Sequence, residues 1–307
     1  MFLTILDADS LAPNIYFDLV EEHIIKNYEK RHTCIYQPPQ IFTRNNLDVP
    51  VITRVYDMMH SFAHCSNLFS IFGLTFPLSN YTLSYTLVKN IGFWDTCADA
   101  IGEDFHTTQK AYWKTNGNIT CVPIYAPFNQ VNIATGKGYM EDVLARFWQA
   151  ERHAQGCADF AYQCKMLFST KFRLKNLVMF FHICETFALP GIVPWIFLSL
   201  LLESNFLFTN GQPDYLIPSL VLTILFNIMG LASNLGYILY EILKRRSNKI
   251  IYKRENESLW RVIEYPIIFI VNFFGISIPT FTIAAFMVLF GKREYVVADK
   301  KLSSTKK

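Results

Sequence analysis

Residues 2–10 read FLTILDADS, a short apolar run that ends in two carboxylates. The run is typical of a buried strand, and residues two apart on a strand point to the same side of a sheet. We therefore expect Asp7 and Asp9 to face one pocket at the carboxyl end of that strand, where α/β folds place their ligands. Two carboxylates there suit a hard divalent cation that also holds a diphosphate. The alternative is an ordinary solvated turn at the end of the strand.

A second acidic pair, Glu103 and Asp104, follows an apolar stretch and precedes a predicted helix at Phe105–Lys114. Acidic residues are common at the start of a helix because they complement its dipole. The functional alternative is that one of the two carboxyls has a raised pKa and accepts a proton from an acceptor hydroxyl. After this helix, the β-branched residues of Asn118–Ile124 predict a strand.

A third feature lies in the run 139–168, which has the pattern of a helix. Positions i, i+3, i+4 and i+7 of a helix share one face, and here they are Gln149, Arg152, His153 and Gly156. An apolar stripe occupies a different face of the same helix. An amide, a guanidinium and an imidazole beside a small residue suit a phosphate or a sugar. A face that only contacts solvent is the alternative.

The chain becomes markedly apolar after Lys175. Overall, charged residues are 17% of the chain, below the roughly 25% typical of soluble proteins. Three apolar segments follow Lys175: 176–202, 215–243 and 262–290. Each is long enough to cross a bilayer, which takes about 20 residues, so we predict a transmembrane region at 176–291. The third segment, with Gly275 and Pro279 near its middle, is either a single span or a broken, re-entrant or interfacial hairpin.

Basic residues orient these segments. Lys and Arg occur just before the first segment and again at 244–254, whereas 203–214 contains neither. Because loops rich in Lys and Arg stay in the cytosol, we expect the polar region 1–175 and the loop after the second segment to be cytosolic. The basic tail 292–307 is expected there too, which a single crossing by the third segment would not allow.

Composition argues against several other classes of protein. The net charge of +3 gives no indication of nucleic-acid binding. The seven cysteines are odd in number and none forms a CxxC pair, which argues against a zinc site and favours free thiols in a reducing compartment. The first residues lack the basic stretch of a signal peptide.

The order of these motifs resembles the membrane-embedded family 2 glycosyltransferases, the group that includes cellulose, chitin and hyaluronan synthases. The best matching stretches are FLTILDADSLAPNIYF, SNYTLSYTLVKNIGFWDTCADAIGEDFHTTQK and RFWQAERHAQG. The resemblance implies that residues 1–175 are the later half of a GT-A-like domain. That fold is an α/β, Rossmann-like nucleotide-sugar fold, here without its first strands and followed by an α-helical transmembrane region. It also implies a nucleotide-binding half upstream of the first strand.

The resemblance implies a role for each acidic motif. Asp7 and Asp9 would bind Mg or Mn together with the nucleotide diphosphate. Asp104 would be the catalytic base, and Glu103 would lie beside it in the substrate site and orient its neighbours.

The resemblance also implies a role for the third motif and a reaction. Gln149, Arg152 and His153 would match the family's Gln-x-x-Arg-Trp, near the acceptor and the diphosphate. His153 stands where the family has tryptophan, a departure that points to a different acceptor or to transfer without processivity. The implied reaction moves a sugar, with inversion, from a nucleotide-diphosphate sugar such as a UDP-sugar to a saccharide or lipid acceptor. It would take place among the lipids of the plasma membrane or a secretory-pathway membrane. A catalytically inactive membrane scaffold with the same fold is the alternative.

Overall fold

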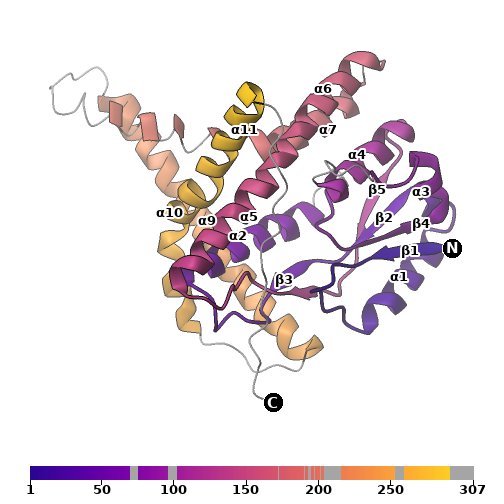
Figure 1. Ribbon diagram of the computed structural model, residues 1–307, viewed down its shortest axis with the longest axis horizontal. Helices are drawn as coiled ribbons and strands as arrows, with labels where there is room; N and C mark the ends of the chain where they lie inside the picture. Colours follow the sequence, from indigo (N-terminus) through magenta and orange to yellow (C-terminus); the bar gives the residue numbers. More distant parts are fainter. Residues whose placement is uncertain are drawn as a thin grey trace.

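A computed structural model of the chain describes residues 1–69, 75–95, 102–171, 173–189, 191–192, 195–196, 198–200, 202–203, 216–252 and 259–290. The N-terminal part contains a mixed sheet flanked by helices, and the C-terminal helices gather beside it (Figure 1). This arrangement agrees with the α/β architecture that the sequence predicts for residues 1–175.

The larger sheet has four strands in the order β1 (Phe2–Ile5), β4 (Tyr81–Ser84), β2 (Cys34–Gln37) and β5 (Thr120–Pro123). Strand β4 runs antiparallel to both of its neighbours, β1 and β2, while β5 is parallel to β2. Strands β1, β2 and β5 therefore all finish at the edge of the sheet where β4 begins, which we call the carboxyl edge. Beyond it lies a two-stranded parallel sheet of β3 (Gln40–Phe42) and β6 (Phe128–Gln130).

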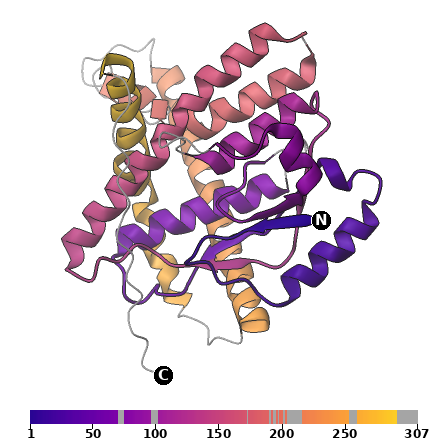
Figure 2. The ribbon, with the colours of Figure 1, turned by 45° about the vertical axis from the view of Figure 1, so that its right-hand side comes forward.

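Apolar cores cover both faces of the four-stranded sheet. On one face, Ile35 and Leu83 pack with residues of α3 (Tyr85–Ile91), α4 (Glu103–Lys114) and α7 (Leu174–Ile183). On the other face, Cys34 and Tyr36 pack with α1 (Ile15–Lys26), the indigo helix at the lower right of Figure 2. Side chains of β2 thus alternate between the two cores, as a strand covered on both faces requires.

A third core joins the N-terminal part to the C-terminal helices. It contains residues of α2 (Val51–Leu68), α5 (Tyr139–Ala154) and α9 (Leu216–Ile251), with the 3₁₀ segment Leu259–Ile267 and α10 (Ile268–Asn272). In Figures 1 and 2 the helices after α9 pack against α2 and α5 and not against the four-stranded sheet.

The predicted elements of the polar region are confirmed with shifted boundaries. The helix expected from Phe105 begins two residues earlier, at Glu103, and the strand expected at Asn118–Ile124 is β5. The run 139–168 is not one helix but two. A 3₁₀ turn at Gln155–Cys157 separates α5 from α6 (Ala158–Ser169), in keeping with the low helix propensity of Gly156 at its centre.

The C-terminal segments are helical but less regular than the sequence predicts. Helix α7 continues into a π-helical turn at Cys184–Ala188, and residues 190, 193, 194, 197 and 201 lie outside the described residues. Helix α9 extends past residue 243 to Ile251. The third segment passes through a π-helical turn at Phe273–Ser277 into α11 (Ile278–Phe290). Asn272 and Ile278, on either side of that turn, have right-handed helical angles, so the helix continues through the turn.

The predicted transmembrane region can be compared with the helices of the structure. Across the ranges given above, no helix is both long enough and apolar enough to cross a bilayer. The Lys and Arg content of the connection at 204–215 and of the tail at 291–307 contributes to the predicted orientation. Both segments lie outside those ranges.

Candidate active site

The two carboxylates of the Asp-x-Asp motif lie at the carboxyl edge, on a turn that follows β1. The strand ends at Ile5, and the backbone N–H of Ser10 donates to the carbonyl of Asp7 at 3.0 Å. Both residues therefore lie on the turn after the strand, and the alternation of a strand does not set their directions. The Asp7 side chain is exposed, whereas Asp9 is half-buried and its carbonyl accepts from Arg44 at 2.6 Å.

A two-residue segment, Ser79 and Asn80, connects this turn to the second acidic pair. The Asn80 side chain accepts from the backbone N–H of Asp7 at 3.1 Å, and the backbone N–H of Ser79 donates to Asp104 Oδ2 at 3.1 Å. Ser79 has a φ of 53°, a left-handed conformation that is uncommon outside glycine and often occurs at functional sites. The structure thus brings Asp7 and Asp104 to the same edge of the sheet.

Asp104 lies in the first turn of α4, not at the end of a strand. Its helix begins after Gly102, which has a φ of 80°. Burial, followed by the negative charges of Glu103 and Asp7, raises the pKa of the Asp104 carboxyl to about 7, against the opposing effect of the Ser79 N–H. The Glu103 side chain is exposed. A carboxyl that titrates near neutral pH can accept a proton under physiological conditions.

Gln149 does not share an outward face with the other residues of its motif. It is buried, and its side-chain oxygen accepts from Arg146 Nη1 at 2.5 Å. Arg146 also forms an ion pair of 2.6 Å with Asp57 Oδ1 and lies 3.7 Å from the centroid of the Tyr56 ring. Gln149 therefore orients a buried guanidinium that joins α5 to α2, and its contact with substrate stays a prediction.

The other two residues of the motif lie nearer the surface. Arg152 is half-buried and His153 is exposed. The His153 ring lies 6.0 Å from that of His60 on α2. Burial, with the nearby charge of Arg146 and the ring of His64, lowers the pKa of His60 to about 3, so His60 is neutral at physiological pH.

The segment that follows α5 contacts the helix that carries the acidic pair. Asp159, at the start of α6, lies 2.7 Å from Nδ1 of His106, two residues after Asp104. The Gln-x-x-Arg helix and the helix of the candidate base are thus connected. The sequence patterns did not single out His106 or Asp159. The position of His106, two residues after Asp104, is the one signal in the sequence that could have indicated it.

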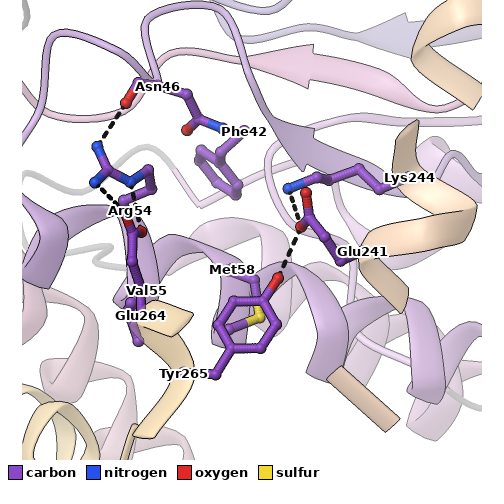
Figure 3. Close-up of a pocket in the computed structure, with 9 residues that line it drawn as sticks. All are labelled: Phe42, Asn46, Arg54, Val55, Met58, Glu241, Lys244, Glu264 and Tyr265. Atoms are coloured by element: carbon purple, nitrogen blue, oxygen red, sulfur yellow. Dashed lines mark hydrogen bonds and ion pairs between the residues drawn. The ribbon is translucent and has the colours of Figure 1, made fainter. Parts of the chain in front are cut away.

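A pocket also lies between α2, α9 and the 3₁₀ segment Leu259–Ile267, and none of the predicted site residues lines it (Figure 3). Arg54 forms two bonds to Glu264, at 2.6 and 2.8 Å. Glu241 lies 2.5 Å from Lys244 and accepts from Tyr265 at 3.0 Å. Because its charged groups pair with one another, this pocket has a structural role. It connects the N-terminal part of the chain to the C-terminal helices.

A divalent cation fits the Asp-x-Asp turn only with help from a ligand. Among the described residues, no group of three or more His, Cys, Asp or Glu side chains is arranged to hold a metal. Asp7 and Asp9 offer two carboxylates, and Mg²⁺ is commonly bound by one or two carboxylates plus substrate phosphates. The residues present are therefore compatible with a cation that arrives with a diphosphate.

Comparison with known sequences identifies the family. No match is found among curated proteins. The sequence model described as Glycosyl transferase family group 2 matches residues 2–240, which is more than half of the chain and includes the Asp-x-Asp turn, the Glu-Asp pair and α5. This protein belongs to that family and is a glycosyltransferase that uses an activated sugar.

Proposed function

We propose that this enzyme transfers a sugar with inversion from a nucleoside-diphosphate sugar, a UDP-sugar in the first instance, to a saccharide or lipid acceptor. The observation that supports it best is the pairing of Asp7 and Asp104 at one edge of the sheet through Ser79 and Asn80. One acid is exposed and close to where a diphosphate would lie, and the other is partly buried with a raised pKa. Two acids in different environments suit two different tasks.

Asp104 is the proposed base. In a single displacement, the acceptor hydroxyl oxygen attacks the anomeric carbon while the bond from that carbon to the phosphate oxygen breaks. The hydroxyl proton passes to the Asp104 carboxylate, and the configuration at the anomeric carbon inverts. With a pKa of about 7, Asp104 is a stronger base than an ordinary aspartate and is still largely ionised just above neutral pH.

Asp7 and Asp9 are the proposed ligands of Mg or Mn. A cation bound there with the diphosphate would offset the negative charge of the leaving group. Arg152 and His153 are proposed to contact the diphosphate or the acceptor, since a guanidinium matches phosphate oxygens. Gln149 would act only indirectly, through Arg146.

We further propose that residues 176–291 hold the enzyme in a membrane, with the polar region on the cytosolic side of the plasma membrane or a secretory-pathway membrane. Large apolar side chains are exposed along α9: Leu220, Val221, Ile224, Leu225, Ile228, Leu231, Leu235, Leu239, Ile242 and Leu243. Extended exposed apolar surfaces mark sites of contact with lipid or protein. Extraction of the protein from cell membranes by detergent but not by alkaline carbonate would support this proposal, and release by carbonate would contradict it.

The test of transfer uses the purified full-length chain, Mn²⁺ or Mg²⁺ and a panel of radiolabelled nucleotide sugars with mixed saccharide and lipid acceptors. Asp104→Asn should lower transfer by about 10²-fold or more, because a positioned base contributes about 10²–10⁴-fold. Its affinity for nucleoside diphosphate should stay unchanged.

Asp142→Asn is a matched control, since Asp142 is another first-turn carboxylate, whose Oδ1 accepts from Thr135. Transfer by Asp104→Asn within about tenfold of wild type would place the base elsewhere. If the wild-type chain binds nucleoside diphosphate but transfers no sugar, the inactive scaffold becomes the better account.

A further inference from the structure

A polar interface joins α4, the helix of the proposed base, to α6. His106 lies between two carboxylates: its Nδ1 is 2.7 Å from Asp159 Oδ1 on α6, and its Nε2 is 3.6 Å from Asp95 Oδ2. Asp95 is in turn 2.9 Å from Lys110, one helical turn after His106. The hydrogen bond from Nδ1 to Asp159 thus holds the imidazole, and Asp95 lies near its other nitrogen, in the turn of α4 that immediately follows Asp104.

Hydrogen bonds continue from this histidine along the interface. Gln109 Nε2 donates to Asp159 Oδ2 at 2.7 Å, and Gln163 Nε2 donates to the Gln109 side-chain oxygen at 2.6 Å. Trp113 Nε1 completes the chain by donating to Gln163 at 3.1 Å. Gln109 and Gln163 have no exposed surface. We call this set, from His106 to Trp113 on α4 with Asp159 and Gln163 on α6, the α4–α6 ladder.

The ladder fixes the position of α4 along its own axis. An apolar interface tolerates small sliding movements, whereas hydrogen bonds need donor–acceptor distances near 3 Å and weaken when they are misaligned. A shift of α4 by a single residue, about 1.5 Å, would break every rung at once and leave buried amides unsatisfied. Its position is therefore defined more sharply than packing alone would define it.

The ladder also sets the position of α4 relative to α6 and, through α6, relative to α5. Helix α6 follows α5 after the 3₁₀ turn Gln155–Cys157. Asp159 therefore stands close along the chain to Arg152 and His153, the residues proposed to contact the diphosphate or the acceptor. Asp104 lies at the other end of this connection, two residues before His106.

We propose that His106 and Asp159 are positioning residues for glycosyl transfer, which hold the first turn of α4, and with it Asp104, in place relative to α5. The proposal rests on the function proposed above for Asp104. A reacting group misplaced by about 1 Å can cost about 10²-fold in rate. Because neither residue needs to touch the donor, loss of the ladder should slow transfer without weakening the binding of nucleotide.

Three variants of the full-length chain test this proposal. His106→Leu removes the donor to Asp159. His106→Asn restores a donor, because the asparagine Nδ2 lies near the position of the imidazole Nδ1. Tyr112→Phe is the matched control: it deletes a buried hydrogen bond of the same helix, the 3.2 Å bond from Tyr112 to Asn176, on the side that faces α7.

The measurements are kcat, the KM for the donor, and amide hydrogen exchange in the first two turns of α4. His106→Leu should lower kcat about 10- to 100-fold with the donor KM within about twofold, and it should speed exchange at residues 106–109, the first amides of α4 with helical acceptors. His106→Asn should recover most of both properties, and Tyr112→Phe should change neither.

Three outcomes would overturn the positioning role: an unchanged kcat in His106→Leu, a donor KM that rises in step with the loss of kcat, or a Tyr112→Phe variant that is equally slow. If the wild-type chain transfers no sugar, the proposed function fails, and hydrogen exchange still decides the positioning role. Exchange at residues 106–109 that stays the same in His106→Leu would then refute it.

Discussion

Asp104→Asn should make the protein more stable at alkaline pH, and the size of the gain follows from the site. The amide keeps the shape of the side chain, and its oxygen can still accept from the Ser79 N–H. Burial and the charges of Glu103 and Asp7 raise the pKa of Asp104 from 3.8 to about 7. Since one pKa unit corresponds to about 1.4 kcal/mol, ionising Asp104 in the folded protein costs at most about 4 kcal/mol.

The sign follows from proton binding. Between about pH 4 and pH 7 the folded state holds a proton on Asp104 that the unfolded state has lost, so this group makes the folded state less stable as the pH rises. Asparagine has no such dependence. The advantage of Asp104→Asn over wild type should therefore grow by about 2–3 kcal/mol between pH 5 and pH 8.

Urea unfolding followed by tryptophan fluorescence measures this difference, with a chelator present so that no cation binds at Asp7. Asp142→Asn is the control, because it removes a carboxylate that accepts two hydrogen bonds of 2.6 Å from Thr135. It should lower the free energy of unfolding at both pH values. If the gain of Asp104→Asn is the same at pH 5 and pH 8, the electrostatic account of Asp104 is wrong.

Activity should move in the opposite direction. The variant gains stability because an unfavourable charge has gone, and that charge is the proposed base, so transfer should be lost as stability rises. In the wild type, kcat/KM should increase with pH through about 7 as Asp104 ionises. A cation bound at Asp7 would cancel one of the charges that raise this pKa, so its presence should move the midpoint to lower pH.

Three further predictions concern other parts of the site. Mn²⁺ should raise the affinity for nucleoside diphosphate in calorimetry, and Asp7→Asn or Asp9→Asn should remove that increase; affinity that ignores both the metal and the substitutions would reject this metal site. Arg146→Met removes the guanidinium that lies 2.6 Å from the buried Asp57 carboxylate and should cost about 3–5 kcal/mol in urea unfolding, whereas a loss below about 1 kcal/mol would show that the pair is unimportant. The sequon at Asn80 should carry no glycan, because its side chain is buried against the Asp7 turn and the region is proposed to be cytosolic; a mass shift on glycosidase treatment would contradict this.

The sequence predicts those parts of the fold that local patterns control. The apolar run at residues 2–5 is a strand, and the spacing within 103–114 gives a helix, because hydrophobic period and terminal charge act over a few residues. The residue at which this strand ends is not set by such a local pattern. It is set by its antiparallel partner β4, whose pairing stops at Tyr81 opposite Ile5.

Contacts between distant segments account for what the sequence did not reveal about the site. Gln149 was predicted to face a ligand because helix geometry alone places it beside Arg152 and His153. Its actual partner is Arg146, which is held by Asp57 on α2. Arg146 lies about one helical turn before Gln149, so the sequence could have indicated it as a partner. Only the packing of α2 against α5 explains why Arg146 is buried.

The acids could be predicted as a set, but the hydrogen bonds that join them come from Ser79 and Asn80, to which the sequence pattern assigns no role. Asn80 holds the Asp7 turn through its side chain, while Ser79 holds Asp104 through its backbone, and the Asn80 side chain donates to Ser79 Oγ at 3.2 Å. Ser79 adopts a left-handed φ of 53° where its N–H donates to Asp104, and such a conformation costs about 1–3 kcal/mol. The same short segment therefore sets the position of the proposed base and that of the proposed cation ligand. A movement of the start of β4 should therefore shift Asp7 and Asp104 together.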